Sequence, residues 1–439
     1  MDLGKALAYL DDHIDLEKTT ALAGRVEGLS LERMRKVVEV LGDPQGAYPV
    51  IHLTGTNGKG STARMITALL AAHGLSAGMF TSPHLEHVTE RISRNLHPIP
   101  TDDFADVISE LASLEPLMGV RPSYFELLTA AAFTWFANEA VDVAVVEVGL
   151  LGRFDATNVA DARVAVVTNV GKDHTDGVGD WRRRVAEEKA GIIGPGSHLI
   201  LGETDPGLAA IFTNEQPQAV WRREADFGCV TDRLAVGGHV VDLRTPNGLI
   251  EEIFLPVHGT HQTENAACAV AAVEALFGRA LSADLVAEAF ASLRLPGRFE
   301  VLHRAPLLVL DGAHNPDGAA AAAHTLRDEF DVAGRRRWVL GFLAGRDVDE
   351  MLDGFGVAPG DQVVTCTPPT PRGLPADDLA AAVRARGVEA VAVGDVGRAV
   401  EVTWEAAQDA GGDDLVLVTG SLYTVGAART ACRRLGLVT

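Results

Sequence analysis

The sequence predicts an α/β fold with two domains: a large, doubly wound domain of the P-loop type and a smaller, Rossmann-like C-terminal α/β domain. Residues 141–148 and 162–170 are nearly continuous apolar runs, which are typical of strands buried on both faces of a parallel sheet. From residue 307 onward, short apolar runs alternate again with helical patterns. Leu295-Pro296-Gly297-Arg298 interrupts these patterns. This break separates two expected domains, at residues 1–296 and 297–439.

The other elements follow from local patterns in chain order. The first domain should contain a strand at 51–54, strands at 77–81 and 198–201, and helices at 31–41, 63–73, 101–111, 125–137, 182–192 and 262–277. We expect an irregular loop at 86–100, which holds Pro98 and Pro100, and an antiparallel meander at 226–255, where alternation is interrupted by glycine turns. Strands of the second domain are expected at 307–310, 338–342, 362–366, 390–393 and 415–419.

Composition limits the class of partner. A chain of 439 residues is too long for one hydrophobic core, and 47% hydrophobic with 22% charged residues is ordinary for a globular protein. The net charge of −22 argues against nucleic acid or an anionic membrane as the main partner. An anionic substrate must therefore be attracted by local arginine and lysine side chains.

The cysteines and the N-terminus indicate a cytoplasmic protein. Cys229, Cys268, Cys366 and Cys432 lie far apart and form no C-x-x-C pair, so we expect reduced thiols rather than a disulfide or zinc framework. The first residues lack the basic and apolar regions of a signal peptide, and no run of 18 apolar residues is present. We therefore expect no membrane contact.

A glycine-rich turn at residues 51–62 predicts a phosphate site. The stretch I-H-L-T-G-T-N-G-K-G-S-T runs from a strand into a helix, and its turn carries Lys59. Backbone N–H groups at a helix N-terminus, together with a lysine, bind phosphate oxygens. The spacing differs from the standard G-x-x-x-x-G-K-[ST], because Gly60 stands between Lys59 and Ser61. A glycine turn without a ligand is the alternative.

Polar residues follow three other strands at their carboxyl ends. These residues are Ser82, Glu147 and His174. In a doubly wound sheet, ligands bind outside the carboxyl ends of the strands, so these side chains should meet the phosphate loop. Ser82 could instead serve only the turn before Pro83, and His174 could be an ordinary loop histidine. A carboxylate inside an apolar strand, as at Glu147, is harder to explain as structure.

These residues belong to an ordered set of motifs. The set is G-T-N-G-K-G-S-T, T-S-P-H-L, E-V-G-x-x-G-R-x-D-A-T-N, D-H-T, E-K-A-G-I-I, L-P-G-R-F-E and D-G-A-H-N-P, and it lies between residues 31 and 426. In this order it resembles the folylpolyglutamate synthase/dihydrofolate synthase family of the Mur ligase superfamily. The resemblance implies an ATP-dependent ligase that joins L-glutamate to the carboxylate of a folate or dihydropteroate through an acyl-phosphate, giving ADP and phosphate.

The resemblance also implies roles for individual residues. ATP would be bound by the glycine-rich turn and by three residues later in the chain. The turn residues are Gly55, Thr56, Asn57, Gly58, Lys59, Gly60, Ser61 and Thr62, and the later residues are Asn265, Arg298 and Asp311. Up to two Mg²⁺ ions would be held by Ser82, Glu147, His174 and a carbamylated Lys189. Catalysis would involve Lys59, Lys189, Asp311 and His314, and the folate-type substrate would contact His84, Arg91 and Phe125. A monomer and a monovalent cation such as K⁺ are further expectations of the family.

Structural explanations remain for several of these positions. Lys189 could be a solvated lysine paired with Glu187 or Glu188. Phe125 could be a core residue, and Arg298 lies in a linker where a surface arginine is common. Asp311 and His314 follow a strand end, where side chains often cap loops.

The chain departs from the family pattern at three places. Leu151 replaces a glycine of E-V-G-x-G-G-R, where a Cβ restricts the backbone. Lys172 stands where the family has an apolar residue, and Asp176-Gly177-Val178-Gly179-Asp180 differs as well. These changes leave the phosphate machinery intact and bear on substrate preference.

Two other functions stay open on the sequence. The first is another Mur-type ligase that adds an amino acid to a different acid; the absence of a nucleotide-sugar domain before Gly55 speaks against the cell-wall branch. The second is a nucleotide-binding switch or scaffold without turnover, which would not need Lys189, Asp311 and His314 together.

Overall fold

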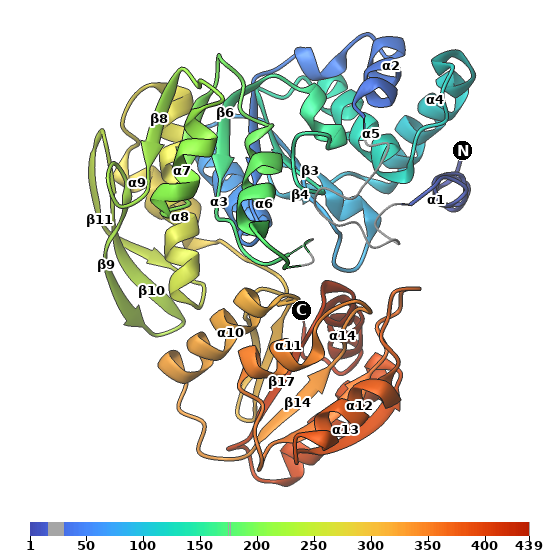
Figure 1. Cartoon of the computed structure of the whole chain (residues 1–439), viewed down its shortest axis with the longest axis vertical. Coiled ribbons are helices and arrows are strands. Elements are labelled where there is room, and N and C mark those ends of the chain that lie inside the picture. Colours follow the sequence, from blue (N-terminus) through green and yellow to red (C-terminus); the bar gives the residue numbers. More distant parts are fainter. Residues whose placement is uncertain (16–29, 174, 176, 439) are drawn as a thin grey trace. The chain divides into compact units, whose positions relative to one another are not determined.

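The computed structural model describes residues 1–15, 30–173, 175 and 177–438 (Figure 1). The chain forms two compact units. The first consists of Met1–His84, Val88–Pro256 and Gln262–Leu293, and the second of Leu85–His87, Val257–His261 and Arg294–Thr439. The second unit thus begins beside the predicted break and also includes two short segments from earlier in the chain.

The first unit is built on an eight-stranded sheet of order β4-β3-β2-β5-β1-β6-β7-β8. Neighbouring strands from β2 to β8 are parallel, and β3 and β4 form an antiparallel edge. This arrangement confirms the parallel sheet expected from the apolar runs. The strands are β1 (Val50–Thr54), β2 (Ala77–Phe80), β3 (Ile92–Arg94), β4 (His97–Pro98), β5 (Val143–Glu147), β6 (Ala162–Val167), β7 (His198–Leu201) and β8 (Ala219–Arg222).

Helices cover this sheet, and a three-stranded antiparallel sheet of order β11-β10-β9 confirms the meander. No helix among the described residues combines the length and hydrophobicity that a membrane span needs. The helices are α1 (Leu3–Asp11), α2 (Glu32–Val40), α3 (Lys59–Ala72), α4 (Thr101–Met118), α5 (Tyr124–Asn138), α6 (Trp181–Ala190), α7 (Pro206–Thr213), α8 (Thr260–Phe277) and α9 (Ala283–Ala291), and the meander strands are β9 (Gly228–Ala235), β10 (Gly238–Thr245) and β11 (Gly248–Leu255).

The segment 86–100 was expected to be an irregular loop, and this expectation was wrong. It contains the 3₁₀ helix η3 (Val88–Arg91) followed by β3 and β4. Strand β3 pairs with β2, so these short strands exist because a neighbouring strand supplies hydrogen-bond partners, which no local pattern reveals. Helix α4 also extends past its predicted end at residue 111, with Pro116 inside its last turn.

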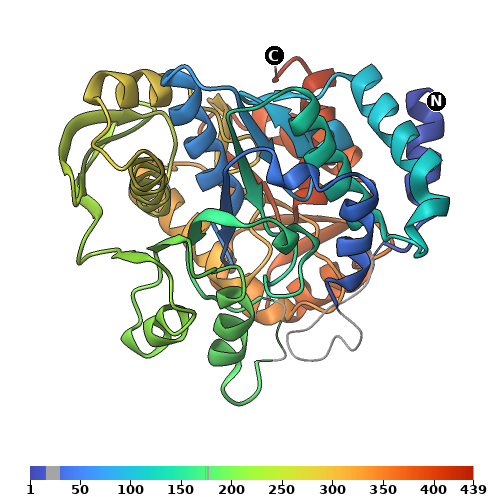
Figure 2. The same cartoon turned by 90° about the horizontal axis from the view of Figure 1, so that it is seen from above.

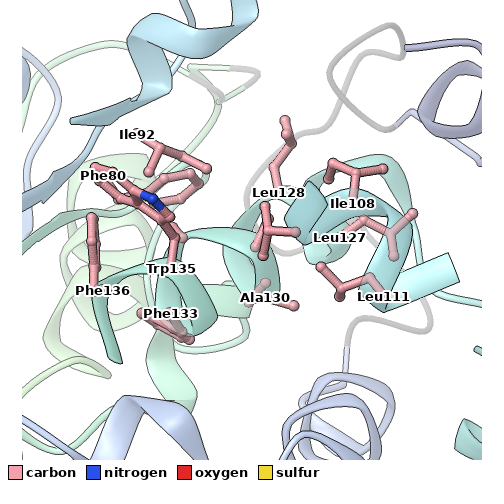
Figure 3. Close-up of a cluster of buried hydrophobic side chains, with 14 of the residues drawn as sticks. Phe80, Ile92, Ile108, Leu111, Leu127, Leu128, Ala130, Phe133, Trp135 and Phe136 are labelled. Carbon is pink, nitrogen blue, oxygen red and sulfur yellow. The ribbon is translucent and has the colours of Figure 1, made fainter. Parts of the chain in front are cut away.

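Helix α5 carries the core on one side of the sheet (Figure 3). Almost every residue of the helix is buried, so it lacks an exposed polar face. The Ser123 hydroxyl accepts a hydrogen bond from the Glu126 amide, and the Glu126 carboxylate accepts one from the Ser123 amide; this capping box defines where the helix begins. Helix α1 packs on α4 at the outside of this layer (Figures 1 and 2).

The second unit has a six-stranded sheet of order β12-β13-β17-β14-β15-β16, parallel except for β12. Two separate hydrophobic clusters lie on its two faces, so this sheet is doubly wound as well. Its elements are β12 (Glu300–Arg304), β13 (Leu307–Asp311), α10 (Pro316–Glu329), β14 (Arg336–Leu340), α11 (Val348–Phe355), β15 (Gln362–Cys366), α12 (Ala376–Ala385), β16 (Glu389–Gly394), α13 (Val396–Asp409), β17 (Leu415–Thr419) and α14 (Leu422–Arg434).

Candidate active site

The predicted phosphate loop joins β1 to α3. Gly55 has φ +149° and Gly58 has φ +84°, both in the region that favours glycine. A Cβ on Gly55 would lie 1.8 Å from the Thr168 hydroxyl oxygen, and one on Gly58 would lie 2.4 Å from the Asn265 side-chain oxygen. Glycine is therefore required at both positions, because the backbone has a positive φ and because the side chains of Thr168 and Asn265 leave no room for a Cβ. Asn265, on α8, is brought to the loop as a neighbour of Gly58.

The loop is held in shape by the segment that follows β6. The Thr56 amide donates to the Asn169 carbonyl at 3.1 Å, and the Asn57 amide donates to the Asn169 side-chain oxygen at 3.0 Å. The Thr168 hydroxyl donates to the Asn57 carbonyl at 2.6 Å. Sequence reasoning missed Thr168 and Asn169. Their position at the carboxyl end of a buried strand was the signal that could have identified them.

Two lysines converge on one carbonyl group of the loop. The Lys59 ammonium donates to the Gly55 carbonyl at 3.1 Å and to the Thr56 carbonyl at 3.3 Å. Lys189, on α6, donates to the same Gly55 carbonyl at 2.8 Å. Its side chain is buried, with the residue 5% exposed, so the alternative of a solvated lysine is wrong.

The surroundings of Lys189 disfavour its charged form. Burial and, to a smaller extent, the positive charge of Lys59 lower the pKa of Lys189 to about 7, against the opposing effect of Asp173. A large fraction of the Lys189 amine is therefore neutral near pH 7. A neutral amine is the form that can act as a nucleophile toward CO₂.

Glu147 ends β5, and the residue is 4% exposed. Its Oε2 accepts a hydrogen bond from the Ser82 amide at 3.2 Å and lies 3.3 Å from where a Cβ on Gly60 would stand. Ser82, Glu147 and the first turn of α3 thus lie together. Carboxylate and hydroxyl oxygens suit Mg²⁺, which keeps several waters and needs few protein ligands.

The third expected metal ligand, His174, lies outside the described residues. Among the residues that are described, no cluster of three or more His, Cys, Asp or Glu side chains could hold a metal ion. Protein oxygen atoms at this place would therefore supply only part of a Mg²⁺ coordination shell, with phosphate oxygens and water supplying the rest.

The predicted substrate residues His84, Arg91 and Phe125 lie near this end of the sheet. Arg91 is 1% exposed, donates from Nε to His84 Nδ1 at 3.0 Å, and holds its guanidinium 5.8 Å from the centre of the Tyr124 ring. Phe125 is half-buried, and a Cβ on Gly149 would lie 2.4 Å from its ring. The Phe125 ring therefore packs directly on the chain that follows Glu147.

Leu151, where the family pattern has glycine, adopts φ +61°. Its carbonyl accepts a hydrogen bond from the Thr54 hydroxyl at 2.6 Å, which ties this loop to β1. The Asp155 carboxylate accepts from the amides of Leu150 and Thr157 at 2.8 Å and 3.0 Å, and burial raises the pKa of Asp155. The loop keeps a glycine-like conformation although leucine occupies the position.

We expect Leu151→Gly to be more stable than Leu151→Ala by about 1 kcal/mol, because alanine keeps the left-handed strain that glycine lacks. Both should be less stable than the original chain, since the Leu151 side chain is buried. Thermal unfolding of the two variants measures this order. Leu128, buried in α5, is the matched control, where the alanine variant should be the more stable of the pair. If the alanine variant were the more stable of the pair at position 151 as well as at position 128, strain at Leu151 would be contradicted.

In the second unit, Asp311 at the end of β13 and His314 just after it lie near Arg298, which precedes β12. The Asp311 carboxylate accepts from the Phe299 amide at 2.8 Å and from the Ala313 amide at 2.9 Å, so it does cap this loop. His314 Nδ1 is 2.9 Å from the Gly312 carbonyl oxygen. A Cβ on Gly312 would lie 3.1 Å from the Arg298 guanidinium. Arg298, from the chain before β12, thus lies beside the loop that carries Asp311 and His314.

Two family models match the chain: the Mur ligase middle domain at residues 53–273 and the Mur ligase glutamate ligase domain at residues 297–422. Dihydrofolate synthase/folylpolyglutamate synthase of Mycobacterium tuberculosis is 40% identical over 91% of this chain and 89% of its own length. The protein with the same name from Escherichia coli is 34% identical over 96% of this chain and 94% of its own length.

Solved structures agree with these matches. Mycobacterium tuberculosis folylpolyglutamate synthase complexed with ADP and AMPPCP has a TM-score of 0.90 and 38% identity, covering 98% of this chain and 97% of that chain. Escherichia coli FolC in complex with DHPP and ADP has a TM-score of 0.85 and 31% identity, covering 99% of each chain. The chain therefore belongs to the folylpolyglutamate synthase/dihydrofolate synthase family of Mur ligases.

Proposed function

We propose that this chain uses ATP to ligate L-glutamate to the carboxylate of a folate or dihydropteroate through an acyl-phosphate, releasing ADP and phosphate. The names of its relatives support this assignment, as do the nucleotides bound in the solved structures of two of them. The observation that carries it is the loop between β1 and α3, where Lys59 and Lys189 converge beside the buried Glu147.

The loop residues would bind the triphosphate. Backbone N–H groups at the start of α3 and the Lys59 ammonium attract phosphate oxygens and stabilise the charge that develops during phosphoryl transfer. Asn265, packed on Gly58, would fix the position of the nucleotide against the loop. The residues that fill these roles in our proposal are Gly55, Thr56, Asn57, Gly58, Lys59, Gly60, Ser61, Thr62 and Asn265.

Mg²⁺ would be held by Ser82, Glu147 and His174, and when bound it neutralises charge on the phosphate oxygens. The Glu147 carboxylate, placed against the first turn of α3, would orient the phosphates from the protein side. A carbamate on Lys189 would add a second set of oxygen donors next to the Gly55 carbonyl. Arg91, His84 and Phe125 would position the acid whose carboxylate is phosphorylated.

Residues of the second unit complete the proposed roles. Arg298 and Asp311 would contact the nucleotide, and His314 would act near the phosphates or the incoming glutamate amine. The motif L-P-G-R-F-E, which overlaps the start of the matched glutamate ligase domain, and the motif D-G-A-H-N-P, which lies within it, support these roles. The chain would work as a monomer and would bind K⁺.

The decisive assay incubates the chain with ATP, Mg²⁺, L-glutamate and either dihydropteroate or tetrahydrofolate, and measures ADP and the glutamylated product. Formation of both with one or the other acid supports the proposal and identifies the acceptor. ADP formation only with a different acid supports another Mur-type amino-acid ligase. Nucleotide binding with no ADP formed under any of these conditions overturns the ligase assignment.

Carbamylation of Lys189 should depend on pH. The neutral amine adds CO₂ to give a carbamate and releases a proton, so the carbamate should increase as the pH rises through about 7, the pKa of Lys189. We expect a ¹³C NMR carbamate signal from protein in ¹³C-bicarbonate at pH 8, much weaker at pH 6, and absent from Lys189→Met. The exposed Lys36 serves as the control, because Lys36→Met should keep the signal. No signal at pH 8 would contradict the carbamate.

A further inference from the structure

Residues Leu85–His87 belong to the second unit, although the chain on both sides of them belongs to the first. Leu85 packs against the hydrophobic cluster that α14 shares with the second sheet. A Cβ on Gly426 of α14 would lie 1.8 Å from the Leu85 carbonyl oxygen. Only glycine at this position therefore allows the segment to lie so close to the helix.

Glu86 carries the polar part of this attachment. Its side chain is 5% exposed and contacts three residues of α14. Arg433 binds it with two nitrogens, at 2.6 Å and 2.9 Å, Arg429 binds it at 2.5 Å, and the Thr430 hydroxyl donates to it at 3.0 Å. The Glu86 carboxylate thus has a bidentate ion pair with Arg433 and a second ion pair with Arg429. It is held far more strongly than a carboxylate in an ordinary surface ion pair.

The charge of Glu86 persists at all working pH values. Burial raises the pKa of Glu86, but the hydrogen bonds from Arg433, Arg429 and Thr430 outweigh it and bring the pKa down to about 2. Arg429 also contacts Glu300 at 3.2 Å, so the cluster stays balanced with two carboxylates and two guanidinium groups.

The segment that precedes Glu86 contains two predicted site residues, Ser82 and His84. The Ser82 amide donates a hydrogen bond to the Glu147 carboxylate, and His84 accepts a hydrogen bond from Arg91. Four residues of chain span about 14 Å at most, so Ser82 cannot move far from wherever Glu86 is fixed. An anchored segment also has fewer conformations to lose when a substrate binds.

We propose that Glu86 is a positioning residue: its contacts with α14 hold the segment Leu85–His87, and the short chain before this segment limits how far Ser82 and His84 can move when the acid substrate binds. It acts through Ser82 and His84 and does not touch the reacting atoms. The proposal rests on the proposed function for its kinetic consequence, but the anchoring itself does not depend on which reaction is catalysed.

The first test measures hydrogen exchange of the amides of residues 81–86 in the full chain without substrates. We expect exchange in Glu86→Gln and Glu86→Ala to be at least about tenfold faster than in the original chain, since loss of the contacts with α14 lets this segment open more often. Glu110→Gln, an exposed glutamate on α4, should exchange as the original chain does. Unchanged exchange in both Glu86 variants would overturn the anchor.

The second test separates positioning from general stability. We expect Glu86→Gln to raise KM for the acid acceptor about fivefold or more while KM for ATP stays within about twofold. Arg433→Gln should reproduce this change, and the double variant should be no worse than either single variant, because the two residues act as one unit. Additive effects, or equal changes in both KM values, would overturn the positioning role. If the original chain ligates no pterin acid, the proposed function fails and the exchange experiment alone decides the anchor.

Discussion

The Lys59→Ala variant should lose ligation by a factor of about 10²–10³ or more while remaining folded. Lys59 is half-buried at the start of α3, and its ammonium contacts only loop carbonyls in the described contacts. Its removal takes a full positive charge from the phosphate site without opening a cavity in the core. Initial rates of ADP formation and thermal unfolding of the same sample measure the two parts of this expectation.

Lys36→Ala provides the control for removal of one lysine, since Lys36 is exposed on α2. It should turn over as the original chain does. Full turnover of Lys59→Ala would remove the phosphate assignment. Loss of the fold in that variant would show that Lys59 supports the loop structure rather than the chemistry.

Glu147→Gln should have the second-largest effect, a loss of about 10²-fold in turnover at limiting Mg²⁺. The Gln side chain keeps the shape of Glu147 and can still accept a hydrogen bond from the Ser82 amide, but it lacks the negative charge that would attract Mg²⁺ in our proposal. The Mg²⁺ concentration at half-maximal rate should therefore rise. Titration of the rate with Mg²⁺ at saturating ATP measures this shift.

Glu274→Gln is the matched control for the loss of a buried carboxylate. Glu274 is 1% exposed on α8 and accepts hydrogen bonds from the Thr245 hydroxyl and the side-chain amide of Asn247. We expect Glu274→Gln to lower the unfolding temperature and to leave the Mg²⁺ dependence unchanged. An unchanged Mg²⁺ dependence in Glu147→Gln as well would contradict the metal role of Glu147.

Part of the site could be predicted because its signals are local. The turn from β1 into α3 needs glycine at particular backbone conformations, and these requirements are written in consecutive residues. Glu147 could be predicted as a site residue for a similar reason, since a carboxylate inside an apolar strand stands out without knowledge of its neighbours. The edge strands β3 and β4 were missed because they depend on pairing with β2.

By itself, the sequence determined the two α/β units, the glycine-rich turn between β1 and α3 and the order of the family motifs, because these depend on short-range patterns of apolar, glycine and charged residues. Only the tertiary structure decided that Lys189 is buried and shares the Gly55 carbonyl with Lys59, across 134 residues of chain. It also decided that Glu86 belongs with α14. The physical reason is that burial and charge pairing arise between segments far apart in sequence, where no local pattern specifies which side chains will meet.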